Sequence, residues 1–149
     1  MENTRHIRRI TPFLWFPHSA AEAARFYCTI FNDSRIISSS PQSATFELEG
    51  QVIIAFNGGP HYQLNEAFSL YINCETQDEV DYYWEKLAEN GKKSRCGWLT
   101  DQFGVTWQVI PSMLISALNH TDREKAGRAM QAMMKMSRIV ISELEEAMA

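Results

Sequence analysis

The chain has 149 residues, of which 45% are hydrophobic and 21% charged, and its formal charge is −4 at pH 7. These proportions are ordinary for a globular protein, and the length suits one domain or two small fused modules. A negative net charge without a basic patch argues against nucleic-acid binding. No apolar run approaches the roughly 20 residues of a membrane-spanning helix, so no membrane partner is expected.

The cysteine pattern bears on the cellular compartment. Cys28, Cys74 and Cys96 are scattered and odd in number, which favours free thiols over a disulfide framework. Residues 1–6 lack the apolar core of a secretory signal peptide. These features predict a cytoplasmic protein. Neither CxxC nor HExxH spacing occurs, which argues against a structural zinc site.

The first half of the chain is predicted to form one module, residues 1–60. Its expected elements are a strand over 7–16, a helix over 19–31, and strands over 35–40, 44–49 and 51–57. Ser19-Ala20-Ala21-Glu22 has the form of a capping box, which opens a helix. Glu49-Gly50 predicts a hairpin turn, and Gly58-Gly59-Pro60 ends the module.

The second half, residues 61–111, repeats this order after a loop that carries His61 and Glu66. Its expected elements are a strand over 68–75, a helix over 76–90, and strands over 92–95, 98–100 and 105–110. Thr76 and Glu79 form a second capping box, and Asn90-Gly91 ends the helix through a left-handed cap. A tight turn over 101–104 precedes the last strand, whose polar mid-strand residue is Gln108.

Both halves align at one offset, with position 19 on position 76, which is 57 residues. At that offset Glu22 meets Glu79, and strand 12–16 falls on 69–73. The apolar helix positions also match, with Ala23, Phe26, Tyr27 and Ile30 on Val80, Tyr83, Trp84 and Leu87. Any two amphipathic helices can be aligned, but the shared strand–cap–helix order favours an internal duplication. The predicted fold is therefore of the α+β class, with two tandem βαβββ modules.

Residues 112–149 are expected to form a C-terminal helical extension, with a short helix over 112–118 and then two more helices. Thr121-Asp122-Arg123-Glu124 is a third capping box. One later face carries Ala126, Met130, Met133 and Met134. A methionine-rich face is adaptable packing material, so it could cover the core of its own domain or form a dimer contact. A homodimer is the expected assembly.

Several motifs carry a family resemblance. They are the Asp-x-Phe-Gly-x-x-Trp-Gln pattern at 101–108, Ile10-Thr11-Pro12-Phe13-Leu14-Trp15-Phe16, Asn57-Gly58-Gly59-Pro60, Asn65-Glu66-Ala67 and Cys96-Gly97-Trp98-Leu99. Together with the duplication, they resemble the vicinal oxygen chelate superfamily, which has the glyoxalase and bleomycin-resistance fold. Within it, the chain is similar to the PhnB-like branch labelled 3-demethylubiquinone-9 3-methyltransferase domain. The resemblance implies curved mixed sheets around a cavity and usually a dimer.

Enzymes of the superfamily hold a divalent metal with His and Glu in the first and last strands of each module. The matching positions here fall near Thr11-Pro12, Phe68-Ser69, Ala55 and Gln108, none of which is His, Asp or Glu. Neutral groups bind a divalent cation weakly, so no metal and no cofactor are expected. The methyltransferase label has no support either, because no GxGxxG turn opens a helix.

The candidate ligand-binding residues combine aromatic and polar groups, as pockets for small molecules do. They are Trp15, Asn57, Glu66, Tyr71, Glu75, Trp98 and Gln108. Trp107 could join them, although any of these tryptophans could instead be core. The two carboxylates could act as general bases if buried, or could cap and pair at the surface.

Other reactive residues are weaker candidates. His61 could line a pocket beside the Gly58-Gly59-Pro60 turn, whereas His6, His18 and His120 are expected in solvent. Only Arg95 lies beside Cys96 to activate its thiol.

Two functional classes remain open. A metal-free protein that binds or sequesters a small molecule is favoured, because the metal ligands and a catalytic pair are missing. The alternative is an enzyme of the superfamily with an unassigned reaction that uses carboxylate and amide groups.

Overall fold

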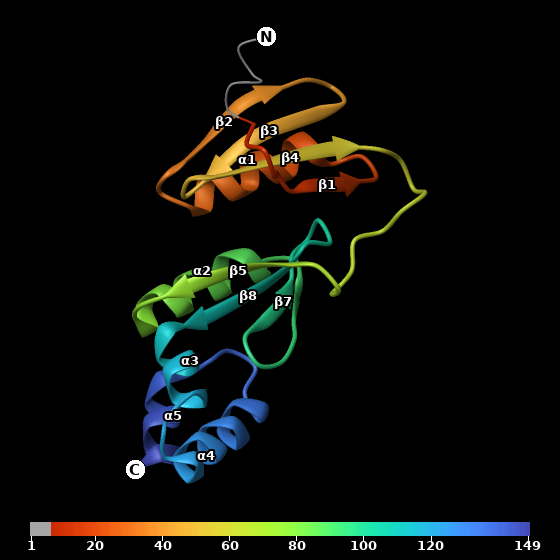
Figure 1. The fold of residues 1–149 in the computed structure, drawn as a ribbon. Coiled ribbons are helices and arrows are strands. Elements are labelled where there is room, and N and C mark those ends of the chain that lie inside the picture. Colours follow the sequence, from red (N-terminus) through yellow and green to blue (C-terminus); the bar gives the residue numbers. More distant parts are fainter. Residues whose placement is uncertain (1–6) are drawn as a thin grey trace. The chain divides into compact units, whose positions relative to one another are not determined.

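The computed structural model describes residues 7–149 of the chain, so His6 lies outside the described residues. The chain divides into two compact units, Met1–Leu64 and Asn65–Ala149. Figure 1 shows one βαβββ module in each unit and three helices at the C-terminal end of the second. None of the described helices is long and apolar enough to cross a bilayer.

The first unit is a four-stranded sheet with one helix on it (Figure 1). Its elements are β1 (Phe13–Phe16), α1 (Ala20–Ile30), β2 (Ser34–Ser39), β3 (Ser43–Leu48) and β4 (Gln51–Asn57). The strand order is β1-β4-β3-β2, with β1 parallel to β4 and the other pairs antiparallel. Leu14, Phe16, Tyr27, Phe46 and Ile53 are fully buried in its core.

Of the local predictions in this unit, the hairpin turn is confirmed, whereas the first strand is shorter than predicted and the helix cap differs. Glu49 and Gly50 both adopt positive φ, 49° and 87°, which is the type I′ geometry that the predicted hairpin needs. The predicted strand over 7–16 begins only at Phe13, because Arg8 and Thr11 bond each other in a turn. The prediction of a capping box at Ser19 is wrong, since the Ser19 side chain makes no capping hydrogen bond.

The second unit repeats the architecture. Its module contains β5 (Ser69–Cys74), α2 (Gln77–Ala88), β6 (Lys92–Lys93), β7 (Trp98–Thr100) and β8 (Thr106–Pro111). The strand order β5-β8-β7-β6, with β5 parallel to β8, matches the first sheet position by position. The predicted pair of βαβββ modules is therefore confirmed.

The offset that aligns the two helices does not align the first strands of the two modules. Helix α1 begins at Ala20 and α2 at Gln77, which keeps the predicted 57. In the first strands, however, an offset of 57 would place the buried Leu14 and Phe16 on the exposed Tyr71 and Asn73. A shift of one residue moves a strand side chain to the other face of its sheet, so the predicted strand alignment was wrong.

The caps of α2 agree better with the sequence. Thr76 Oγ1 accepts from Glu79 N at 3.2 Å, and Glu79 Oε1 accepts from Glu75 N at 3.0 Å. The predicted capping box therefore forms, except that the Glu79 side chain bonds the backbone N–H of Glu75 and not that of the cap residue Thr76. Asn90 takes the predicted left-handed conformation at φ 58°.

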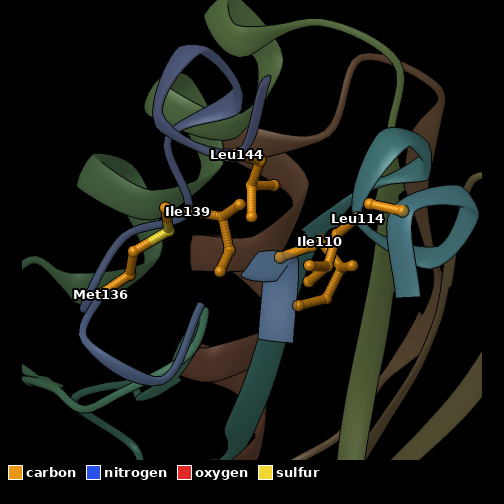
Figure 2. Close-up of a cluster of buried hydrophobic side chains, with 7 residues drawn as sticks. Ile110, Leu114, Met136, Ile139 and Leu144 are labelled. Carbon is orange, nitrogen blue, oxygen red and sulfur yellow. The ribbon is translucent and has the colours of Figure 1, made fainter. Parts of the chain in front are cut away.

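The C-terminal extension contains α3 (Ser112–Leu118), α4 (Arg123–Met134) and α5 (Ile141–Met148). Asp122, not Thr121, caps α4 by accepting from Glu124 N and Lys125 N. The three helices enclose a hydrophobic cluster with the end of β8 (Figure 2). Its buried members are Ile110, Leu114, Ala117, Ala129, Met136, Ile139 and Leu144. The extension thus completes the core of the second unit.

The predicted methionine face is divided between core and solvent. Met133 packs against the cluster, whereas Met130 and Met134 are 45% and 56% exposed. Positions 130 and 134 are four residues apart and share one outward side of α4. Met133 therefore covers the core of its own unit, whereas Met130 and Met134 do not.

The segment between α4 and α5 holds the loop between β6 and β7. Cys96 N donates to Met136 O at 2.9 Å, and Gly97 N donates to Ser137 O at 2.8 Å. Ser137 Oγ donates to Ser94 O at 2.6 Å. These bonds fix the loop that leads into Trp98.

Candidate functional site

The turn before β8 is organised by one buried carboxylate. Asp101 Oδ1 accepts from Phe103 N at 2.8 Å and Val105 N at 3.1 Å, and Oδ2 accepts from Trp107 Nε1 at 2.8 Å. Trp107 is buried, so the interpretation of this tryptophan as core is confirmed. The Asp, Gly and Trp of the motif therefore build the strand that positions Gln108.

The second sheet has one face without α2, which we call the open face of the second sheet. The buried Leu99 and Trp107 pair with each other. The alternate positions turn to the other side. This open face carries Ser69, Tyr71, Trp98, Thr100, Thr106 and Gln108.

Three of the predicted site residues form a row across this face. Gln108 on β8 pairs with Tyr71 on one side and Trp98 on the other. Gln108 Nε2 donates to Ser69 Oγ at 2.9 Å, which fixes the amide. Tyr71 is 48% exposed. The row offers two aromatic side chains around one amide.

A small hollow of about 70 Å³ lies at the β6–β7 end of the same face. It is lined by Glu66, Lys92, Ser94, Trp98, Leu99, Thr100 and Thr106. Thr106 is 2% exposed, and its Oγ1 has no hydrogen-bond partner. A buried unpaired hydroxyl costs about 1–3 kcal/mol.

The positions that hold metal in superfamily enzymes do not suit a cation here. Ser69 and Gln108 bond each other through neutral groups. Ala55, the position expected in the first module, is fully buried and pairs with the buried Leu14, so its side chain lies on the face opposite to that of Trp15 and Phe56. Within residues 7–149, no group of three or more His, Cys, Asp or Glu could hold a metal ion.

The corresponding face of the first sheet is aromatic. Phe13 and Trp15 lie 5.6 and 5.4 Å from Phe56 between ring centroids, and Tyr62 lies 4.9 Å from Trp15. Trp15 Nε1 donates to Gly59 O at 2.9 Å. The sequence analysis found Trp15 but not the other three rings; strand alternation was the available signal for Phe13 and Phe56, whereas Tyr62 lies between β4 and β5.

Gly58 is shaped by this cluster. A Cβ added to Gly58 would come 2.2 Å from Trp15 Cε2, so the indole packs directly on the glycine. The Gly58-Gly59-Pro60 turn therefore serves an aromatic contact in the first unit. His61, next in the chain, is exposed.

Asn57 and Glu75 lie away from these faces. Asn57 Oδ1 accepts from Ala20 N at 2.8 Å, and its Nδ2 donates to Pro41 O at 3.2 Å, so this amide caps α1 in place of Ser19. Glu75 follows β5, whereas Glu66 precedes it. Ser112 Oγ and Asn73 Nδ2 both donate to Glu75 Oε1, which joins the end of β5 to the start of α3.

The cysteines differ in their surroundings. Burial, followed by the negative charges of Glu79 and Glu75, raises the pKa of the Cys74 thiol to about 12, so this thiol stays protonated at neutral pH. Burial also raises the pKa of Tyr71, with a smaller contribution from Cys74. Cys96 is half-buried at a φ of 58°. Its neighbour Arg95 donates to Met134 O at 2.7 Å.

Comparisons with known proteins place this architecture in a family. A family model described as 3-demethylubiquinone-9 3-methyltransferase matches residues 8–110. The chain belongs to this family. The match ends before α3, so the C-terminal extension of this family member lies outside the matched residues. A search of curated proteins found no match.

Solved structures agree with the family. A PhnB protein from Bacillus cereus is 32% identical, with a TM-score of 0.65, and the match covers 70% of this chain and 100% of that chain. A protein from Pseudomonas aeruginosa is 22% identical over 70% of this chain and 98% of its own, with a TM-score of 0.58.

A more distant match is the fosfomycin resistance protein FosX from Listeria monocytogenes, solved with Mn(II) and a sulfate ion. It is 17% identical over 67% of this chain and 86% of its own, with a TM-score of 0.52. At this identity the likeness shows the fold alone. The predicted glyoxalase and bleomycin-resistance fold and its PhnB-like branch are confirmed.

Proposed function

We propose that this family member binds a small organic molecule on the open face of the second sheet, without a metal. The row of Tyr71, Gln108 and Trp98 carries the proposal, because it combines exposed aromatic surface with a fixed amide. Small-molecule sites are mostly apolar with a few placed polar groups. One of the two N–H groups of Gln108 Nε2 is used by Ser69, so Gln108 would present its carbonyl oxygen and its second N–H group to a ligand.

The other predicted residues enter the proposal differently. Glu66 lies at the hollow beside Trp98 and belongs to the proposed site. Trp15 lies in the aromatic cluster of the first unit and remains a separate candidate there. Asn57 and Glu75 are hydrogen-bonded within the fold, so they remain candidates of lower rank.

The alternative is an enzyme with an unassigned reaction. Such an enzyme would need an acid or base beside the reacting group. On the open face of the second sheet, Glu66 is the candidate. The carboxylate of Glu75 is bonded to Ser112 beyond the far end of β5. Binding without reaction is therefore the function that we favour.

Assembly and compartment form part of the same proposal. We infer a homodimer, because both sheets are open and sheet edges are normally paired or covered. All three cysteines are free thiols, which supports a reducing, cytoplasmic environment.

A ligand screen with two matched tyrosine variants tests the binding proposal. Thermal shifts are measured against a panel of small aromatic compounds, for the wild type, Tyr71→Ala and Tyr82→Ala. Tyr82 lies on α2 and is 39% exposed, so it controls for loss of an exposed tyrosine. We expect ligand-induced shifts that Tyr71→Ala removes and Tyr82→Ala retains. Shifts that survive in both variants would contradict the proposed face.

A further inference from the structure

We propose that the hollow beside Trp98 binds the carboxylate of an acidic ligand, through Lys92 and the hydroxyls of Ser94, Thr100 and Thr106. This inference rests on the proposed binding function and names the ligand class of the same face. All four residues line the hollow of about 70 Å³. One water molecule needs only about 10–15 Å³ of cavity volume, so the space accommodates a carboxylate.

The unpaired hydroxyl of Thr106 is the first observation that points to a ligand. Nearly all buried polar groups in proteins have a hydrogen-bond partner. Thr106 Oγ1 has none, although the residue lines the hollow and is almost fully buried. Rotation about its Cβ–Oγ1 bond would let the hydroxyl donate to a ligand oxygen. Ligand binding would then remove the cost of the unpaired group.

The second observation is the charge on β6. Lys92 and Lys93 are adjacent, but they pair in the sheet with different partners, Thr100 and Leu99. Lys93 Nζ forms an ion pair with Glu85 at 3.3 Å. Within residues 7–149, Lys92 forms no ion pair, and it lines the hollow. An ammonium group can only donate hydrogen bonds, and the neighbouring hydroxyls can either donate or accept them. This combination suits an oxyanion.

Glu66 limits the charge of that oxyanion. Its carboxylate lines the same hollow, so one negative group already faces the one positive group. A dianion such as phosphate would add more repulsion from Glu66 than a carboxylate does. The ligand group that fits this balance carries a single negative charge.

The test titrates acetate into the full-length ¹⁵N-labelled protein at constant ionic strength and follows the backbone amides. Acetamide is the neutral isostere, and inorganic phosphate is the competing anion. We expect saturable acetate shifts confined to residues 92–100 and 106, with no response to acetamide and weaker binding of phosphate. Equal shifts with acetamide, or tighter binding of phosphate, would overturn the carboxylate assignment.

Matched variants test each group. Lys92→Met should weaken acetate binding about tenfold, the size of one charge-assisted contact, whereas Lys93→Met should leave it within about twofold. Glu66→Gln should strengthen binding, because it removes a like charge. Equal losses in both lysine variants would refute the assignment of Lys92.

Thr106→Val separates a binding role from a structural one. Because it removes an unpaired buried hydroxyl and keeps the shape, it should raise the melting temperature and yet weaken acetate binding. A rise in melting temperature with unchanged binding would refute the role of Thr106. If neutral aromatic compounds bind through Tyr71 while acetate does not bind, this inference fails and the proposed function stands.

Discussion

Asp101 is the residue whose replacement tests our account of the second unit most sharply. Its carboxylate accepts from two backbone amides and from Trp107 Nε1 at 2.8 Å. Asp101 is only 3% exposed. Asp101→Ala leaves these donors without their acceptor. At about 1–3 kcal/mol for each unsatisfied buried donor, and with partial rescue by water, we expect a loss of about 3–5 kcal/mol in unfolding free energy.

Asp101→Asn divides this loss into parts. The amide keeps an oxygen for the Phe103 and Val105 N–H groups but turns an NH₂ group toward the indole N–H of Trp107, so donor meets donor. We expect a loss of about 2–3 kcal/mol, most of which depends on Trp107. In a double-mutant cycle with Trp107→Phe, the two changes should be non-additive by at least about 1 kcal/mol.

Urea unfolding followed by circular dichroism measures these values without depending on tryptophan fluorescence. A loss below about 1 kcal/mol in Asp101→Ala would refute the view that this carboxylate organises the turn. Additive effects of Asp101→Asn and Trp107→Phe would refute the specific role of the indole bond.

Three further changes have expected outcomes. Gly58→Ala should destabilise the first unit by about 1–3 kcal/mol through overpacking on Trp15, whereas Gly127→Ala, in open space on α4, should stabilise by up to about 1 kcal/mol; thermal unfolding compares them, and equal effects would contradict the packing argument. Because the folded pKa of Cys74 is raised to about 12, its contribution to stability is present below about pH 9 and is lost as pH rises further. Urea midpoints should therefore fall more steeply above pH 9 in the wild type than in Cys74→Val, and parallel curves would count against a buried neutral thiol. If Met130 and Met134 form the dimer contact, Met130→Ser/Met134→Ser should weaken association in sedimentation over a dilution series with stability unchanged within about 0.5 kcal/mol, whereas an unchanged dimer constant places the contact elsewhere.

The sequence predicted the elements and their duplication well because those signals are local. Thr76, Asn90 and the Glu49-Gly50 turn act within a few residues of themselves. The cap of α1 could not be predicted in this way, because Asn57 reaches Ala20 from the end of β4. Asn57, which caps α1, was for this reason predicted to be a polar residue of the ligand pocket.

The candidate site was harder to predict because it depends on strand parity. The helix pattern suggested an offset of 57, but in the first strands that offset matches the buried Leu14 with the exposed Tyr71, which exchanges the two faces of the sheet. Ala55 is buried beside Leu14, and its neighbour Phe56 lies on the other face with Trp15. Likewise, Lys92 and Lys93 are indistinguishable in sequence, and only the register with Thr100 and Leu99 separates them.

The packing of the C-terminal extension also needed the structure. Helical periodicity placed Met130, Met133 and Met134 on one face. The hydrogen bonds from Cys96 and Gly97 hold the segment that follows α4 against the β6–β7 loop. These contacts join segments about 40 residues apart, which no local pattern reports.

Mapping of a bound ligand tests the central claim most directly. The strongest compound from the aromatic panel is added to ¹⁵N-labelled protein, and amide shifts and intermolecular nuclear Overhauser effects are recorded. We predict that they gather on Tyr71, Trp98 and Gln108, with smaller shifts along 92–100. A saturable site whose contacts lie instead on α3, α4 or α5 would contradict the claim that the open face of the second sheet binds the ligand.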